Sequence, residues 1–172
     1  MSALEIAVRI SAALGSFDEV TWTAPGVDLV VRVDLGTGSR TLGETFVALT
    51  AGYVPIDSHV NLADGEIVHG ALIGGLQRGP VHVAGIVDVS YVAYHGDPDV
   101  LVLHPGVDLV KREGGVTPAL GIESGYRFSR TVAAGGFVRA ALRELTVYDG
   151  GGGDTARARL ILVGAFLDVR LR

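Results

Sequence analysis

The chain contains no cysteine, few charged residues and few aromatic ones. The absence of cysteine excludes a disulfide scaffold, a thiolate metal site and a cysteine nucleophile. Only 19% of the 172 residues are charged, against about 25% in ordinary soluble domains. The mean hydropathy is correspondingly high, at +0.41. This composition predicts a surface that is partly covered by something other than water.

Long hydrophobic runs are also lacking. The longest, residues 160–163, continues past Gly164 only as far as Leu167, well short of the roughly 20 residues of a membrane-spanning helix. The N-terminus has no basic segment followed by an apolar core, so we expect no secretory signal. We therefore predict synthesis in the cytoplasm and no membrane contact. Other protein subunits would cover the apolar surface, and a monomer with strands buried on both faces is the alternative.

The charge balance argues against a nucleic-acid partner. The net charge is -5, and the basic residues are dispersed arginines with a single lysine, Lys111. Proteins that bind nucleic acid directly concentrate positive charge to neutralise phosphates. We expect no direct contact with nucleic acid.

The first segment has the signals of a short helix. Ser2 and Glu5 have the spacing of a capping box, and Glu5 and Arg9 are four residues apart, as in a helical ion pair. Gly15 stands where a helix often ends. These features predict a short N-terminal helix, docked on its own sheet or on a neighbouring subunit.

The rest of the chain has the pattern of β-strands. Residues 27–35 alternate apolar side chains with Asp28, Arg32 and Asp34, which predicts one wet face and one buried face. Similar segments recur between turns rich in glycine and proline, and the chain has 25 glycines. These segments are residues 46–54, 60–62, 66–73, 81–94, 100–103 and 107–110. The pattern predicts a mainly β fold, an antiparallel sandwich or barrel.

The last third predicts a long C-terminal hairpin. Residues 137–148 lead into four glycines between Asp149 and Asp154, and residues 156–171 return. A hairpin tip explains that glycine run better than a cation or phosphate loop does, because no lysine follows it. Residues 137–145 also contain good helix formers, which leaves a helix as the alternative there.

The chain as a whole, residues 1–172, fits one β-rich domain. An echo of residues 25–32 in residues 105–112 raises the alternative of an internal duplication, with lobes at 20–100 and 101–172. Because a strand that begins with Pro-Gly is common, chance similarity explains the echo equally simply.

The densest group of residues able to bind a cation is His95, Asp97, Asp99 and His104. A turn in which the aspartates accept backbone amides is the favoured interpretation. No serine lies in the G-x-S-x-G context of a hydrolase. We therefore assign no catalytic, cofactor-binding or metal residue, no cofactor and no enzymatic activity.

These inferences favour a structural role. We predict a subunit of a multi-protein assembly that forms homo-oligomers, most specifically a minor or capsid-decorating virion protein that is carried in the particle. A small-ligand-binding β-barrel, which would need a central cavity, is one alternative. A hydrolase or metal-dependent enzyme on a β-scaffold is the other.

Overall fold

The computed structural model describes residues 4–17, 20–36, 43–56, 63–96, 113–143, 145–148, 155–158 and 160–171. This part of the chain is all β-structure, without a helix. Its strands are β1 (Leu4–Phe17), β2 (Val20–Asp34), β3 (Glu44–Ile56), β4 (Ala63–Arg78), β5 (Val81–Gly96), β6 (Glu113–Arg127), β7 (Val132–Ala141), β8 (Leu145–Tyr148), β9 (Thr155–Ala158) and β10 (Ile161–Leu171).

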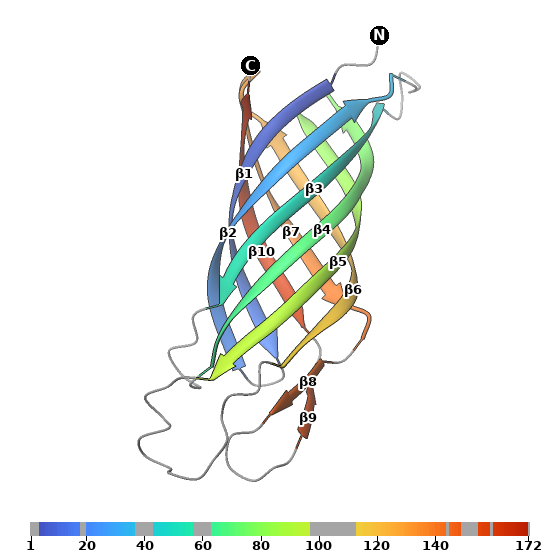
Figure 1. Cartoon of the computed structure of the whole chain (residues 1–172). Coiled ribbons are helices and arrows are strands. Elements are labelled where there is room, and N and C mark those ends of the chain that lie inside the picture. The colour runs from blue at the N-terminus through green and yellow to red at the C-terminus, as the bar shows by residue number, and fades with distance from the viewer. Residues whose placement is uncertain are drawn as a thin grey trace.

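Eight of these strands close into an antiparallel barrel (Figure 1). Around the wall the order is β1-β10-β7-β6-β5-β4-β3-β2, and β2 returns to β1. The first and last strands therefore pair with each other, from Ile6 opposite Leu171 to Ser16 opposite Ile161. Closure leaves no unpaired strand edge, and it requires the strands to tilt as Figure 1 shows. Of the predicted sandwich or barrel, the chain forms the barrel.

The predicted N-terminal helix is wrong, because residues 4–17 form β1. This strand pairs along its length with β2, and with β10 on its other side. Ile6 and Ile10 point outward, whereas Glu5 and Arg9 both point into the barrel. A spacing of four residues places two side chains on one face of a strand as well as of a helix. Backbone pairing to two neighbours then decides for the strand.

The predicted C-terminal hairpin has the expected pairing. β7 pairs with β10 in the barrel wall, and β8 pairs with β9 in a two-stranded extension beyond it (Figure 1). The helical alternative for residues 137–145 is wrong over residues 137–141, which belong to strand β7, and at Leu145, which begins strand β8. The glycine-rich tip, residues 149–154, lies outside the described residues, as do the predicted strands 60–62, 100–103 and 107–110.

The two ends of the barrel differ. At one end, here called the terminal end, lie the start of β1 and the end of β10, the connection from β2 to β3 through residues 35–43, the Gly79–Pro80 turn and the turn at residues 128–131 (Figure 1). Gly79 has a φ of 59°, which favours glycine. At the other end, the loop end, barrel strands are joined through residues 18–19, residues 57–62, residues 97–112 and residues 142–160, which include β8 and β9. The two longest connections between barrel strands, residues 97–112 and residues 142–160, are therefore both at the loop end.

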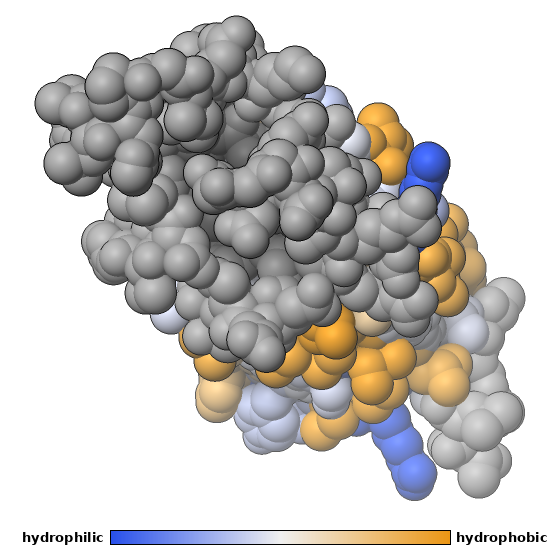
Figure 2. Space-filling view, turned by 90° about the horizontal axis from the view of Figure 1, so that it is seen from below, coloured by the Kyte–Doolittle hydropathy of each residue, from blue (hydrophilic) through white to orange (hydrophobic). Residues whose placement is uncertain are grey.

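The polar and apolar faces of the strands are exchanged relative to the prediction: the more apolar face points outward, and the face that carries the polar side chains points into the interior of the barrel. Val27 and Leu29 of β2 are 56% and 50% exposed, whereas Asp28 between them is 2% exposed. The face that we expected to be wet is thus the inside of the barrel. Seen from the loop end, apolar residues line the outer wall (Figure 2).

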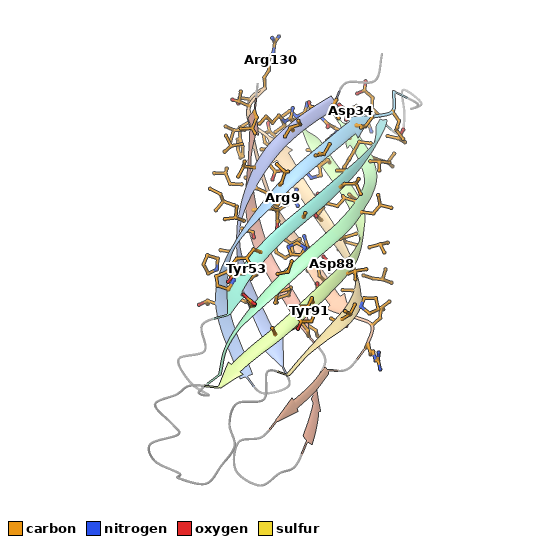
Figure 3. All side chains as sticks on the ribbon, in the orientation of Figure 1. Arg9, Asp34, Tyr53, Asp88, Tyr91 and Arg130 are labelled. Carbon is orange, nitrogen blue, oxygen red and sulfur yellow. The ribbon has the colours of Figure 1, made fainter. Side chains whose placement is uncertain are left out.

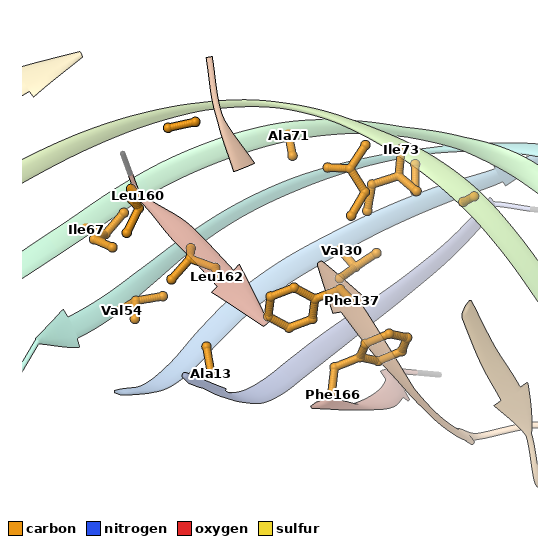
Figure 4. Packing of buried hydrophobic residues seen from close by; sticks show 14 of the residues in the cluster. Ala13, Val30, Val54, Ile67, Ala71, Ile73, Phe137, Leu160, Leu162 and Phe166 are labelled. Carbon is orange, nitrogen blue, oxygen red and sulfur yellow. The ribbon is translucent and has the colours of Figure 1, made fainter. Parts of the chain in front are cut away.

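Side chains fill much of the barrel interior. Apolar residues from several strands meet there, among them Ile67, Ile73, Phe137 and Phe166 (Figure 4). Inward-facing glycines make room for the aromatic rings: a Cβ at Gly164 would lie 2.7 Å from Cζ of Phe137. An eight-stranded barrel is just wide enough to be filled in this way.

Candidate functional site

The outer wall of the barrel is almost free of charge. Among the described strand residues that face outward, only Glu66 and Arg78 are charged, and both lie toward the ends of β4. The others are mainly Val, Leu, Ile, Ala and Gly. Large exposed side chains occur on each of the eight barrel strands, for example Ile10, Leu49 and Ile122. The apolar surface therefore encircles the molecule and is no single patch.

The height of this apolar band follows from strand geometry. The outward residues of β5 run from Val81 to Tyr91. Ten residue steps of about 3.3 Å, inclined at about 40° to the axis, rise about 25 Å. That is about the height of the lipid-facing band of barrels that span an outer membrane.

Exposed aromatic side chains lie toward both ends of this band. Tyr53 and Tyr91 lie toward the loop end (Figure 3), and Tyr126 and Phe128 lie beside the 128–131 turn at the terminal end. The rings of Tyr126 and Phe128 are 5.0 Å apart. Aromatic rings gather at the two water interfaces of membrane barrels, because they are apolar but tolerate contact with headgroups.

A polar cluster occupies the middle of the lumen. His69 lies between two carboxylates, with Nδ1 3.0 Å from Asp88 Oδ2 and Nε2 2.9 Å from Asp28 Oδ1. Arg139 reaches across from β7 and donates to the same Asp88 oxygen at 3.0 Å. Ser90 donates to the other oxygen of Asp88. All five side chains are buried, so the cluster links three regions of the wall from within.

A second buried cluster is centred on Arg9. Its guanidinium donates to Glu123 and to Asp168, at 2.7 Å in each case. It also stacks over the ring of Phe166, with 3.9 Å between Cζ and the ring centroid. Nε2 of His82 lies 3.5 Å from Oε1 of Glu123. Pairing on this scale offsets the large cost of moving charges out of water.

The third cluster lies at the terminal end, in the mouth of the barrel. Glu5 accepts from Arg170 at 2.7 Å, and it lies 3.5 Å from Arg127 and 4.0 Å from Arg32. Gln77 accepts hydrogen bonds from both Arg32 and Arg127. These side chains are only partly buried, so this cluster, unlike the other two, is open to solvent.

Two hollows open around this mouth cluster. The larger is a shallow depression of about 570 Å³, bounded by the turn at Gly79 and Pro80 and by the turn that carries Ser129 and Arg130. The smaller, of about 30 Å³, lies among residues shared with it and extends down to His82 and Asp168. Both hollows belong to the mouth, and the middle of the lumen holds packed side chains instead. The central cavity of a ligand-binding barrel is therefore not found in the described interior.

The residues that the sequence suggested for a cation lie elsewhere. His95 is the second-last residue of strand β5, toward the loop end, and Asp97, Asp99 and His104 lie outside the described residues. Within the described part, no group of three acidic, histidine or cysteine side chains is placed to hold a metal ion. Sequence reasoning missed the buried polar clusters. The alternation of Asp28, Arg32 and Asp34 along β2 marks a polar face, but it shows neither that this face lies inside the barrel nor which partners it meets there.

Comparisons with known proteins bear on the fold alone. No family model and no curated protein matches the sequence. Solved outer-membrane proteins have a similar fold. Neisserial surface protein A aligns with a TM-score of 0.57 at 9% identity, over 99% of each chain. A major outer membrane protein from Thermus thermophilus aligns with a TM-score of 0.51 at 14% identity, over 96% of this chain and 99% of that one. The outer membrane enzyme PagL aligns with a TM-score of 0.51 at 12% identity, over 95% of this chain and 99% of that one.

These findings correct the functional predictions. The interpretation as a virion or capsid-decorating protein is wrong, because the fold is that of outer-membrane barrels. The expected absence of a membrane, and the location in the cytoplasm or a virus particle, are wrong for the same reason. The apolar side chains surround the whole barrel and do not form a single subunit contact, so the predicted homo-oligomer stays a prediction. No helix in the described part of the chain is long and apolar enough to cross a bilayer.

Proposed function

We propose that this chain is an integral protein of a bacterial outer membrane, which it spans as a closed eight-stranded barrel. One observation carries the proposal: the outer wall is apolar all the way round, over about the height of a bilayer core, while the described charged side chains of the barrel strands, apart from Glu66 and Arg78 toward the ends of β4, point inward. The similar fold of solved outer-membrane proteins supports the same conclusion.

The energetics of the two faces favour this environment. Burying a valine, leucine or isoleucine side chain contributes about 1.5–3 kcal/mol, and the exposed apolar side chains of the wall gain that contribution only where water is excluded. Lipid also demands that every backbone polar group be paired within the protein, which a closed barrel achieves. The pairing of β1 with β10 completes that requirement.

The orientation follows from the unequal ends. Barrels of this kind have short turns on the periplasmic side and longer loops outside the cell. The connections at the terminal end are residues 35–43, 79–80 and 128–131, and none is as long as residues 97–112 or 142–160 at the other end, so we place the terminal end in the periplasm. The loop end, with residues 97–112 and the β8–β9 extension, then faces outward.

We further propose that the barrel is a scaffold that presents its outer loops, and not a pore or an enzyme. The central cluster and the apolar core occupy the described lumen and would block ion flow. Ser90 donates to Asp88 and not to His69, and both ring nitrogens of His69 are held by carboxylates. These buried groups are therefore committed to one another, without the serine–histidine contact that nucleophilic catalysis needs.

Refolding experiments test the proposal. The urea-unfolded chain should fold when diluted into uncharged detergent or phosphatidylcholine vesicles, with a β-type circular dichroism spectrum and a faster-migrating band when the sample is left unheated in electrophoresis. The same dilution without lipid or detergent should give aggregates. A monodisperse, folded monomer in plain buffer would contradict a membrane location. Regular single-channel conductance in a planar bilayer would contradict the closed lumen.

A further inference from the structure

The mouth of the barrel at the terminal end has more positive charge than it neutralises. Arg127, Arg130 and Arg170 line the depression, and among the described residues that line it Glu5 is the only acidic one. Arg32 lies directly below, but its guanidinium is engaged by Asp34, with Nε donating at 2.8 Å. The remaining three arginines therefore share one carboxylate.

The guanidiniums of the mouth also have unused donors. Among the described residues, Arg127 donates only through Nη2, to Glu5 at 3.5 Å and to Gln77 at 3.2 Å. Arg170 donates only through Nη1, to Glu5 at 2.7 Å and to the backbone oxygen of Arg130 at 3.5 Å. The side chain of Arg130 projects from the turn (Figure 3) and has no acidic partner in the described part.

Because the guanidiniums of Arg127 and Arg170 are partly buried, their N–H donors are held in fixed positions and are less screened by water than those of an exposed arginine. Arg170 and Arg127 are held by Glu5 and Gln77 at the lip of the barrel, partly shielded from water. A guanidinium presents several N–H groups in one plane and matches the oxygens of a phosphoryl group in a bidentate manner. The depression, of about 570 Å³, has the size of a small-ligand site.

We propose that the terminal-end mouth is a binding site for a phosphate-bearing anion, held by Arg127, Arg130 and Arg170. Glu5 orients Arg127 and Arg170 and at the same time limits the affinity, because its carboxylate competes with the ligand for the same donors. The phosphoryl group comes from the aqueous side, either free in solution or on a lipid headgroup. This inference concerns the mouth alone and holds for the folded barrel in detergent as well as in a membrane.

Titration of the refolded barrel with sodium tripolyphosphate in uncharged maltoside detergent tests the site. Calorimetry should show saturable binding to one site. Arg127→Gln should weaken it about tenfold, since the variant loses a charged hydrogen-bond donor to the anion. The exposed Arg130→Gln should weaken it about threefold. The control is Arg143→Gln, an exposed arginine just after β7 at the loop end, which should bind as the wild type does.

Glu5→Gln is the decisive variant, because it moves the affinity in the opposite direction. Removing the competing carboxylate should tighten tripolyphosphate binding several-fold, whereas simple damage to the mouth would weaken it. The unheated gel shift confirms for each variant that the barrel has folded. Mixed micelles with phosphatidylglycerol, in place of tripolyphosphate, distinguish a headgroup from a free ligand. The proposal is overturned if neither probe binds, or if Arg127→Gln and Arg143→Gln bind equally, even where the barrel itself is folded and membrane-inserted.

Discussion

Replacing Val87 by arginine places a charge on the outer wall near the middle of the apolar band. Val87 is 54% exposed and lies between Leu72 and Leu120 on the neighbouring strands. Six residue steps separate it from Val81, or about 15 Å along the axis of a band about 25 Å tall. It therefore lies about 2–3 Å from the midplane.

The two possible environments give different costs for this substitution. At the midplane of a bilayer, an arginine on the lipid face costs about 2–4 kcal/mol. On a wall exposed to water, the same change stays within about 0.5 kcal/mol, because no buried contact is lost. We expect Val87→Arg to lower the free energy of unfolding by about 2–4 kcal/mol, measured by urea titration of the barrel in phosphatidylcholine vesicles.

The matched control is Val116→Arg on β6. Val116 is 60% exposed and pairs with Tyr91 at the loop-end boundary of the band. A charge near the interface costs about 0–1 kcal/mol, so this variant should unfold close to the wild type. If both variants stay within about 0.5 kcal/mol of the wild type, the wall faces water and the membrane proposal fails. If both variants lost an equal and large free energy of unfolding, the cause would be weaker β-pairing and not the depth of the arginine in the bilayer.

Two further substitutions test the interior. Gly52→Ala should lower the free energy of unfolding by about 1–3 kcal/mol, because the new Cβ would lie 1.6 Å from Oδ1 of Asp28. The control is Gly70→Ala, whose Cβ would lie 3.7 Å from its nearest atom, the backbone oxygen of Thr50. Equal losses for the two variants in urea titration would contradict the packing described. Glu123→Ala leaves the buried guanidinium of Arg9 with one carboxylate instead of two and should cost about 3–5 kcal/mol, so a loss below about 1 kcal/mol would show that water replaces the pair.

The β-architecture was accessible from the sequence because its signals are local. Alternation such as that of residues 27–35, punctuated by glycine and proline, predicts strands, and their number and spacing predict a sandwich or barrel. The prediction of a helix in residues 4–17 was wrong for an equally local reason. The four-residue spacing of Glu5 and Arg9 fits both structures, whereas the alternation of Leu4, Ile6 and Val8 with their neighbours fits a strand alone.

Which face lies inside could not be decided from alternation alone. A strand with Asp28 on one face and Leu29 on the other has the same pattern in a soluble sheet and in a membrane barrel. The low charge content agrees with the apolar outer wall. The prediction of no membrane contact, however, rested on a length that applies to membrane-spanning helices and not to strands. A tilted strand crosses with about 9–11 residues, which segments such as 81–94 easily reach.

The partners inside the lumen were beyond sequence reasoning because they are set by closure. Arg9 and Glu123 are 114 positions apart, and their contact depends on which strands are opposite each other across the barrel and on the register of each pairing. The same geometry explains why the lumen holds its charges in clusters. Because the outer wall is apolar, most charged residues of the strands face the interior. The lumen of an eight-stranded barrel is filled by side chains, so few water molecules can solvate each charge there. A charge in the lumen therefore needs an opposite charge beside it. At the terminal-end mouth water solvates the side chains, so Arg130 has no acidic partner in the described part of the chain and needs none.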